Sequence, residues 1–358
     1  MQNPGTITLM GSGETSPMAG QVYEILARQL LDRFPPPLTI SVLETPAGFE
    51  VNAERVAGRV ADFFTTRLQN YHPQIQLIPA RKKGTSFSPD APEVVEPLYH
   101  SQMIFFGPGS PTYTVRQLDN SLAWSILQAR HRLGADLVLA SAAIVSLSAL
   151  ALPVYEIYKV GEDIHWKPGL DFFKPYGLSL AIIPHWNNNE GGDEVDTSRC
   201  FMGRERFSRL QEMLPPDMVL LGIDEHSALT IDLEAKTCFV RGVGQVHIIK
   251  GDSVQECAAG CSFSIYDLGE YHPLDDPAQG LPEPVWQRAI AIQQAGRQQD
   301  LPDSAIPNEV WQLVNQRQAA RQSQDWALAD QIRDRIRGMG WELKDTNDGP
   351  VIERILAR

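Results

Sequence analysis

The chain has 358 residues, 43% of them hydrophobic, and a formal net charge of −13. These values are typical of a globular protein with two or three domains, and they exclude a mainly disordered chain. The negative charge argues against non-specific nucleic-acid binding by the chain as a whole, because lysine and arginine contacts to phosphate supply most of that affinity.

Apolar strand-like runs alternate with helical stretches through the first 250 residues. The expected strands are residues 7–10, 38–43, 75–78, 103–106, 137–140 and 178–183, and the expected helices are residues 22–33, 53–70 and 122–133. This alternation predicts βαβ units around a mostly parallel sheet, an α/β fold of the doubly wound class. Four shorter apolar runs predict an antiparallel extension of that sheet: 219–223, 228–231, 237–240 and 245–249.

Composition divides the chain into three parts. Residues 1–271 are predicted to form the α/β domain. Residues 272–284 are rich in proline, aspartate and glycine, which is typical of a linker, and we expect a linker with one helix over residues 272–305. Residues 306–358 are expected to form a separate small helical module.

The uncharged run at residues 137–155 approaches the roughly 20 residues that a transmembrane helix needs. Its serines and Pro153 make it a poor lipid-facing span, and a buried strand followed by a helix is favoured. The chain also does not open on a basic segment followed by an apolar one, because its first basic residue is Arg28. We therefore expect no membrane association and a cytoplasmic protein.

Four cysteines, Cys200, Cys238, Cys257 and Cys261, are too few and too irregularly spaced for a disulfide framework or a zinc site. They are expected to be reduced, buried thiols. No metal site is predicted.

Glycine-rich or polar residues follow four of the expected strands, where the carboxyl ends of parallel strands meet at one edge of a sheet. Ser141 follows the fifth strand and His185 the sixth. A serine hydroxyl becomes nucleophilic when a neighbouring imidazole takes its proton, so this pair predicts covalent hydrolysis. A lone histidine at a strand end is more often structural, and the prediction therefore depends on the convergence of all four loops: 11–14, 107–110, 141–143 and 185–187.

Several segments in order resemble the serine peptidases of family S51, the dipeptidase E and cyanophycinase type. The segments are IFFGPGSPTYTVRQL (104–118), Ser141-Ala142, PHW around His185, and GIDEHSALTI (222–231). The resemblance covers roughly residues 5–250 and implies a flavodoxin-like fold of the class I glutamine-amidotransferase type.

The resemblance also implies an activity and the residues that perform it. The activity is hydrolysis of a small peptide or isopeptide amide bond through an acyl-enzyme, without a cofactor. Ser141 would be the nucleophile and His185 the general base, and the backbone N–H groups of Gly109 and Ala142 would bind the oxyanion.

The sequence leaves open which carboxylate orients the imidazole. Glu156 matches an acidic position in the family and is the first candidate, and Glu190, in the polar loop after His185, is the second. Glu225 is expected either near the site or in support of it. Glu14, Asn187 and Glu190 are expected to contact substrate, although Glu14 would also suit a helix N-terminus and Asn187 a turn.

The turn around Ser141 departs from the usual G-x-S-x-G pattern, in which small residues let strand and helix approach closely. Leu139 and Ala143 occupy the glycine positions and could relax the strained serine conformation. Two interpretations therefore remain: an active serine hydrolase, or a catalytically degenerate scaffold that binds tRNA or a translation partner through its C-terminal module.

The segment QRQAARQSQDWALADQIRDRIRGMGWELKDTNDG (316–349) resembles the C-terminal end of cysteinyl-tRNA synthetase. Its periodicity predicts two helices and a small hairpin with a core of their own. The resemblance implies a contact with tRNA, for which two i,i+4 arginine pairs are candidates: Arg317 with Arg321, and Arg333 with Arg337. A solvated, salt-bridged helix face is the alternative.

The synthetase's catalytic signatures are absent, so aminoacylation is not predicted. The short strands after residue 218 leave an unpaired sheet edge, which allows a homodimer.

Overall fold

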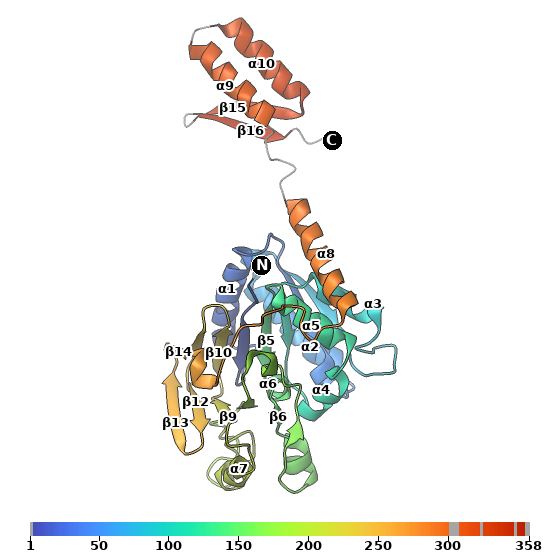
Figure 1. Ribbon diagram of the computed structural model, residues 1–358, viewed down its shortest axis with the longest axis vertical. Coiled ribbons are helices and arrows are strands. Elements are labelled where there is room, and N and C mark those ends of the chain that lie inside the picture. The colour runs from blue at the N-terminus through green and yellow to red at the C-terminus, as the bar shows by residue number, and fades with distance from the viewer. Residues whose placement is uncertain (1–2, 301–307, 323–324, 347–348, 355–358) are drawn as a thin grey trace. The chain divides into compact units, whose positions relative to one another are not determined.

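The computed structural model describes residues 3–300, 308–322, 325–346 and 349–354 (Figure 1). The chain folds into two units, of which the first ends at Ile292 and the second begins at Gln293.

An eight-stranded mixed sheet forms the centre of the first unit, with the strand order β14-β11-β10-β1-β5-β4-β2-β3. Neighbours among the last five strands of this order are parallel, and β10, β11 and β14 extend the sheet in antiparallel fashion. Their bounds are β1 Ile7–Met10, β2 Thr39–Leu43, β3 Gln74–Ile78, β4 Met103–Phe106, β5 Asp136–Ala140, β10 Ser227–Asp232, β11 Thr237–Gly242 and β14 Ser262–Ser264. The predicted α/β class with an antiparallel extension is confirmed.

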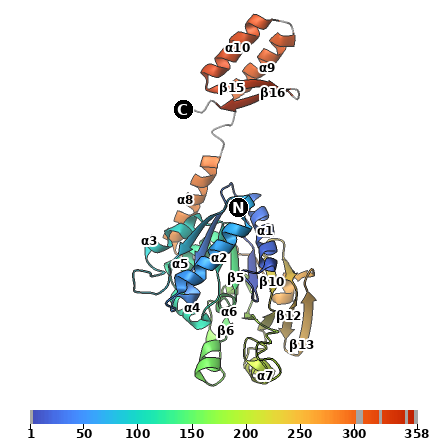
Figure 2. The same ribbon diagram turned by 180° about the vertical axis from the view of Figure 1, so that it is seen from behind.

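Alternate residues of the strands face opposite layers of helices, as the period of two in a β-strand requires. In β4, Ile104 and Phe106 join one apolar cluster, while Met103 and Phe105 join another. The first cluster is covered by α5 (Leu122–Arg132), and the second by α1 (Pro17–Leu31) and α2 (Ala53–Arg67). Figure 2 shows α1 and α2 on the face turned toward the viewer.

A second sheet of four strands, in the order β13-β12-β9-β8, lies beyond the first. Its strands are β8 (Leu180–Ile183), β9 (Val219–Ile223), β12 (Gln245–Lys250) and β13 (Ser253–Ala258). The sequence predicts residues 178–183 in the main sheet, but β8 pairs with β9 instead. Helix α7 (Gly203–Glu212) connects β8 to β9, so these two parallel strands form a βαβ unit within the second sheet.

The remaining elements of the first unit are short. They are α3 Pro92–Val95, α4 Pro111–Leu118, α6 Ala142–Ser146, the paired strands β6 Leu150–Ala151 and β7 Lys167–Pro168, the π-helical turn η4 Glu156–Val160, and the 3-10 turns η1 Thr45–Ala47, η2 Gln69–Tyr71, η3 Glu96–His100, η5 Lys174–Tyr176 and η6 Ile265–Leu268.

The segment expected as a linker packs on the first unit. Arg132 donates hydrogen bonds of 2.9 and 2.6 Å to the carbonyl oxygens of Pro277 and Gln279. Helix α8 (Glu283–Asp300) then places Val285, Trp286 and Ala289 in the core of this unit. The first unit therefore continues past residue 271, where the sequence analysis ends the domain.

The second unit contains α9 (Asn308–Gln322), α10 (Trp326–Gly338) and the hairpin of β15 (Trp341–Thr346) with β16 (Gly349–Arg354). Its small core is formed by Val310, Leu313, Val314, Ile332, Ile336, Trp341 and Leu343. The predicted arrangement of two helices and a hairpin is confirmed.

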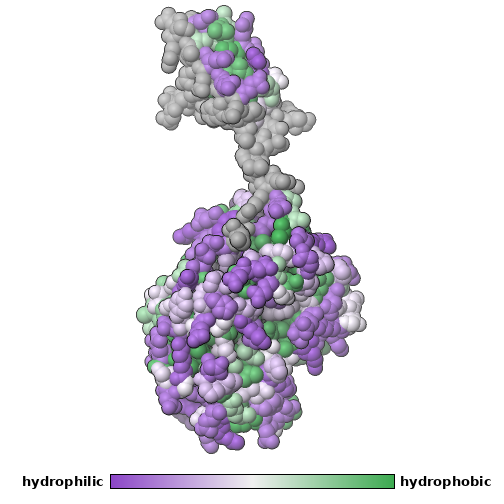
Figure 3. All heavy atoms as spheres, viewed as in Figure 1, coloured by the Kyte–Doolittle hydropathy of each residue, from purple (hydrophilic) through white to green (hydrophobic). Residues whose placement is uncertain are grey.

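The surface and the cysteines fit an ordinary globular protein. In the view of Figure 3, hydrophilic residues predominate on the visible face of the first unit, with hydrophobic ones interspersed. Within the described residues, no helix is both long and apolar enough to cross a membrane. The four cysteines are free thiols, and Cys261 is exposed while the other three are buried.

Candidate active site

Ser141 lies at the turn between β5 and α6 in a backbone conformation that side chains rarely adopt, with φ 53° and ψ −118°. Such a conformation costs on the order of 1–3 kcal/mol and persists only where its surroundings enforce it. Leu139 is fully buried in the core and Ala143 is buried within α6. The strained turn thus forms without the usual glycines, and the predicted relaxation does not occur.

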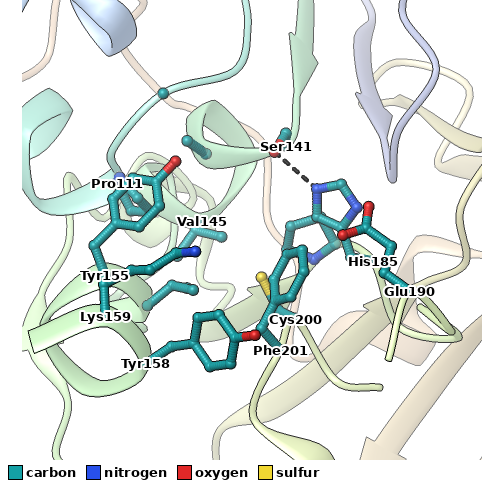
Figure 4. Close-up of a pocket in the computed structure, with 14 residues that line it drawn as sticks. Pro111, Ser141, Val145, Tyr155, Tyr158, Lys159, His185, Glu190, Cys200 and Phe201 are labelled. Atoms are coloured by element: carbon teal, nitrogen blue, oxygen red, sulfur yellow. Dashed lines mark hydrogen bonds between the residues drawn. The ribbon is translucent and has the colours of Figure 1, made fainter. Parts of the chain in front are cut away.

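His185 follows β8 and faces Ser141 from the second sheet. Its Nε2 atom lies 2.9 Å from Ser141 Oγ, as the dashed line in Figure 4 shows. His185 also has a left-handed backbone, with φ 52°. Three hydrogen bonds hold that backbone: the His185 N–H donates to Gly11 O at 3.3 Å, and His185 O accepts from the N–H groups of Asn188 at 3.1 Å and Cys200 at 3.2 Å.

Glu225 lies in the turn between β9 and β10 and contacts the other imidazole nitrogen. Its Oε1 atom is 2.9 Å from His185 Nδ1 and accepts a hydrogen bond of 2.9 Å from Asn188 Nδ2. The Glu225 N–H in turn donates to Asn187 Oδ1 at 2.8 Å. A continuous chain of polar contacts therefore joins Ser141, His185 and Glu225.

The hydrogen bonds from His185 and Asn188 hold the pKa of Glu225 below its ordinary value, although burial opposes them. A lowered pKa means that the folded state favours the charged carboxylate. Its contribution to stability is therefore present above the ordinary pKa of a glutamate and is lost as the pH falls through the lowered value.

The structure corrects the expectation for the acid that orients the imidazole. Glu156 Oε1 accepts hydrogen bonds from Thr112 Oγ1 at 2.6 Å and from Lys167 Nζ at 3.4 Å, not from His185. Glu190 borders the cavity at Ser141, and its backbone N–H donates to Asn188 Oδ1 at 3.2 Å. Neither carboxylate takes the position beside Nδ1, because Glu225 occupies it.

A cavity of about 250 Å³ opens beside Ser141 (Figure 4). Tyr155, Tyr158 and Lys159, on and next to η4, line one side, and Glu190 and Phe201 line another. Among the lining residues, Lys159 is the one cationic side chain and Glu190 the one carboxylate. The cavity therefore presents both signs of charge on a mainly apolar wall.

The two backbone positions expected to bind an oxyanion, Gly109 and Ala142, both line this cavity. Gly109 has φ 150°, and a Cβ atom there would lie 2.0 Å from Pro46 O, so only glycine fits. Ala142 is the first residue of α6, and its N–H therefore has no acceptor within the helix.

The other expected substrate contacts differ in their surroundings. Glu14 is half-buried and is not among the residues that line the cavity. Asn187 supports the backbone of Glu225, as described above. Asn188, in the same polar loop, is buried and donates to the Glu225 carboxylate.

Cys200 borders the cavity but is not a second nucleophile. Burial, followed by the nearby charge of Glu225, raises the pKa of its thiol to about 12. Since the thiolate is the reactive form, this raised pKa disfavours Cys200 as a nucleophile at neutral pH. In the part of the chain that the structure describes, no group of three or more potential ligands could hold a metal ion.

A solved structure of a peptidase from an acI-B1 actinobacterium is similar to the first unit. The two align with a TM-score of 0.59 and 23% sequence identity, over 73% of this chain and 97% of the other. The first unit has the fold of a peptidase. The resemblance expected from the sequence is thereby confirmed at the level of the fold, and no family model matches the chain.

A second set of similar proteins matches a small part of the chain. Cysteine–tRNA ligase of Methanosarcina acetivorans is 38% identical over 61 residues, which are 17% of this chain and 12% of the ligase. The ligase of Finegoldia magna is 46% identical over 52 residues, 14% of this chain and 11% of the ligase. This resemblance is also confirmed, but the chain spans only about a tenth of the length of these relatives.

The four arginines expected to contact RNA are not equivalent in the second unit. Arg317 is buried, which contradicts its expected place on the surface. The Arg321 guanidinium lies over the exposed ring of Trp326, 5.9 Å from its centroid, and Arg333 pairs with Asp330 at 3.1 Å. Arg337 is exposed near the end of α10.

Proposed function

We propose that the first unit is a serine hydrolase of the S51 type that cleaves an amide bond through an acyl-enzyme. The single observation that carries the proposal is the chain of contacts from Ser141 Oγ through both nitrogens of His185 to Glu225, each 2.9 Å long. The peptidase fold supports the same conclusion. Glu225 takes the role of the triad acid.

The mechanism follows from the chemistry of these three groups. Ser141 Oγ attacks the substrate carbonyl carbon while its proton passes to His185 Nε2. The imidazolium then gives this proton to the leaving nitrogen as the carbon–nitrogen bond breaks. A water molecule attacks the resulting ester, again with His185 as the base, and the free acid leaves while the proton returns to Ser141.

Two features would lower the barrier of this reaction. The negatively charged Glu225 holds Nδ1 protonated and stabilises the imidazolium that forms. The N–H groups of Gly109 and Ala142 would donate to the developing oxyanion, and each such donor is worth roughly 3 kcal/mol in comparable sites. The cavity of about 250 Å³ suits a short peptide or isopeptide.

The proposal predicts that the purified chain hydrolyses short peptide amides or activated esters and that Ser141→Ala abolishes this activity. The exposed Ser86→Ala variant is the matched control and should retain it. Turnover that survives Ser141→Ala unchanged would contradict the assignment of the nucleophile.

We propose as a second function that the second unit binds tRNA, because its relatives are named as tRNA ligases. Charge supports the idea: residues 306–358 contain eight basic and eight acidic residues, so the excess negative charge of the chain lies elsewhere. Arg337 and Trp326 are exposed there and could contact phosphate and a base.

Replacing both Arg333 and Arg337 with alanine is expected to weaken tRNA binding and to reduce its dependence on salt, since each lost phosphate contact lowers that slope. Electrophoretic mobility shift at several salt concentrations is the measurement. The pair Arg55→Ala and Arg59→Ala, exposed on α2 at the same spacing, is the control. Binding that is absent, or equally weakened by both pairs, would contradict this function.

A further inference from the structure

Glu156 is held firmly although it does not contact His185. Its Oε1 atom accepts from Thr112 Oγ1 at 2.6 Å, within the range of short charge-assisted bonds, and from Lys167 Nζ at 3.4 Å. Burial raises the pKa of Glu156, but the hydrogen bond from Thr112, a hydrogen bond with its own backbone and the charge of Lys167 together outweigh it and leave that pKa lowered. Among the described residues, the second oxygen, Oε2, is buried without a hydrogen-bond partner. Thr112 and Lys167 are therefore the side chains that hold this carboxylate.

The first donor, Thr112, follows directly on the loop that carries Gly109. Thr112 is three residues beyond Gly109, in the first turn of α4. Its hydroxyl also lies 3.2 Å from Ser110 Oγ, and the Ser110 N–H donates to Pro46 O at 3.0 Å. The position of Thr112 is thus linked to the position of the backbone that would face the oxyanion.

Glu156 itself begins η4, the turn that lines the cavity next to that loop. Tyr158 and Lys159 of this turn, and Tyr155 just before it, line the cavity. π-helical turns are rare and are frequently found at functional sites. The second donor, Lys167, lies on β7, which pairs with β6 upstream of the same turn. One carboxylate therefore joins the oxyanion side of the cavity to the side that would contact the substrate.

We propose that Glu156 is a positioning residue that fixes the spacing between the Gly109 loop and the η4 wall, through its bond to Thr112. This inference rests on the proposed hydrolase function and adds a determinant of both catalysis and substrate binding to it. A displacement of about 1 Å in a catalytic site can cost 10²-fold in rate. A hydrogen bond that fixes this spacing therefore affects kcat as well as KM.

The test is a double-mutant cycle with Glu156→Ala and Thr112→Val. Each single variant is expected to lower kcat/KM by about 10- to 100-fold, with contributions from both kcat and KM. The double variant should be little worse than either, because both changes remove the same bond. Glu156→Gln keeps an oxygen for Thr112 but loses the charge opposite Lys167, and it should retain most of the activity, within about 3- to 10-fold.

The rate of reaction with a small fluorophosphonate distinguishes a positioning role of Glu156 from a purely structural one, because a purely structural role would leave this rate unchanged. The rate constant for reaction of the fluorophosphonate with the folded protein depends on Ser141 and the oxyanion donors and not on the substrate wall. We expect that rate constant to fall in Thr112→Val and Glu156→Ala. The exposed Asp163→Asn, a charge change in the same segment, is the control and should react as the wild type does.

The possible outcomes separate this inference from the function on which it rests. A wild-type protein that neither hydrolyses esters nor reacts with the probe would overturn the proposed function and the inference with it. An active wild type whose Glu156→Ala and Thr112→Val variants melt earlier but react at unchanged rates would overturn the positioning role alone. Additive losses in the double variant would also overturn it.

Discussion

Replacing Glu225 with glutamine is expected to lower the rate of acyl-enzyme formation by about 10³- to 10⁴-fold while leaving the fold intact. The neutral amide keeps the size of the side chain but no longer stabilises the imidazolium beside Ser141. It also removes the negative charge that fixes Nδ1 as the protonated nitrogen. Steady-state kcat with an activated ester measures the loss, and circular dichroism confirms the fold.

The matched controls for Glu225 are the two carboxylates that the sequence favours for its role. Glu156→Gln and Glu190→Gln should each cost far less, since the hydrogen bond to His185 Nδ1 comes from Glu225. An equal loss in Glu156→Gln and Glu225→Gln would contradict the assignment of the triad acid.

Gly109→Ala is expected to lower kcat by about 10²- to 10³-fold, the cost of losing one oxyanion donor. The new Cβ atom would lie 2.0 Å from Pro46 O, a backbone atom that cannot move aside without shifting the loop. The N–H of residue 109 would move with it. KM should change less than kcat, because the oxyanion forms only in the transition state.

Gly58→Ala is the control for this substitution. Gly58 lies within α2, and a Cβ atom there meets nothing within 4 Å. Alanine should stabilise the helix by roughly 0.5–1 kcal/mol and leave the activity unchanged. If Gly109→Ala remained as active as Gly58→Ala, the N–H of residue 109 would have no part in the reaction.

The sequence predicts Ser141 and His185 because each directly follows an apolar strand, and strand ends are where α/β folds place polar groups. It does not predict the contact of Glu225 with the imidazole, because Glu225 is forty residues beyond His185 and reaches it through the pairing of β8 with β9 in a second sheet. No local pattern reports such a pairing. The resemblance around GIDE is the only signal in the sequence that places Glu225 near the site.

The sequence contains a pattern that explains the burial of Arg317. Val310, Leu313, Val314 and Arg317 follow each other at the spacing of one helix face, and the first three form the core of the second unit. Arg317 therefore faces inward with them. The i,i+4 spacing between Arg317 and Arg321 predicts a shared basic surface only if the apolar residues on the same helix face as Arg317 are left out of account.

The strained turn at Ser141 is the part of the site that the sequence describes least well. G-x-S-x-G predicts close approach of strand and helix through small residues. Here Leu139 points into the core from β5, and Ala143 packs inside α6, so neither side chain obstructs the turn. The glycines are one way to form this turn and not a requirement for it.

The central claim is that Ser141 is an activated nucleophile, and covalent labelling tests it most directly. The folded wild-type chain is treated with a fluorophosphonate at neutral pH, digested and analysed by mass spectrometry. The account predicts one adduct per chain on Ser141, none in Ser141→Ala, and strongly slowed labelling in His185→Ala. A folded wild-type chain that forms no adduct, or forms it on another residue, would contradict the account.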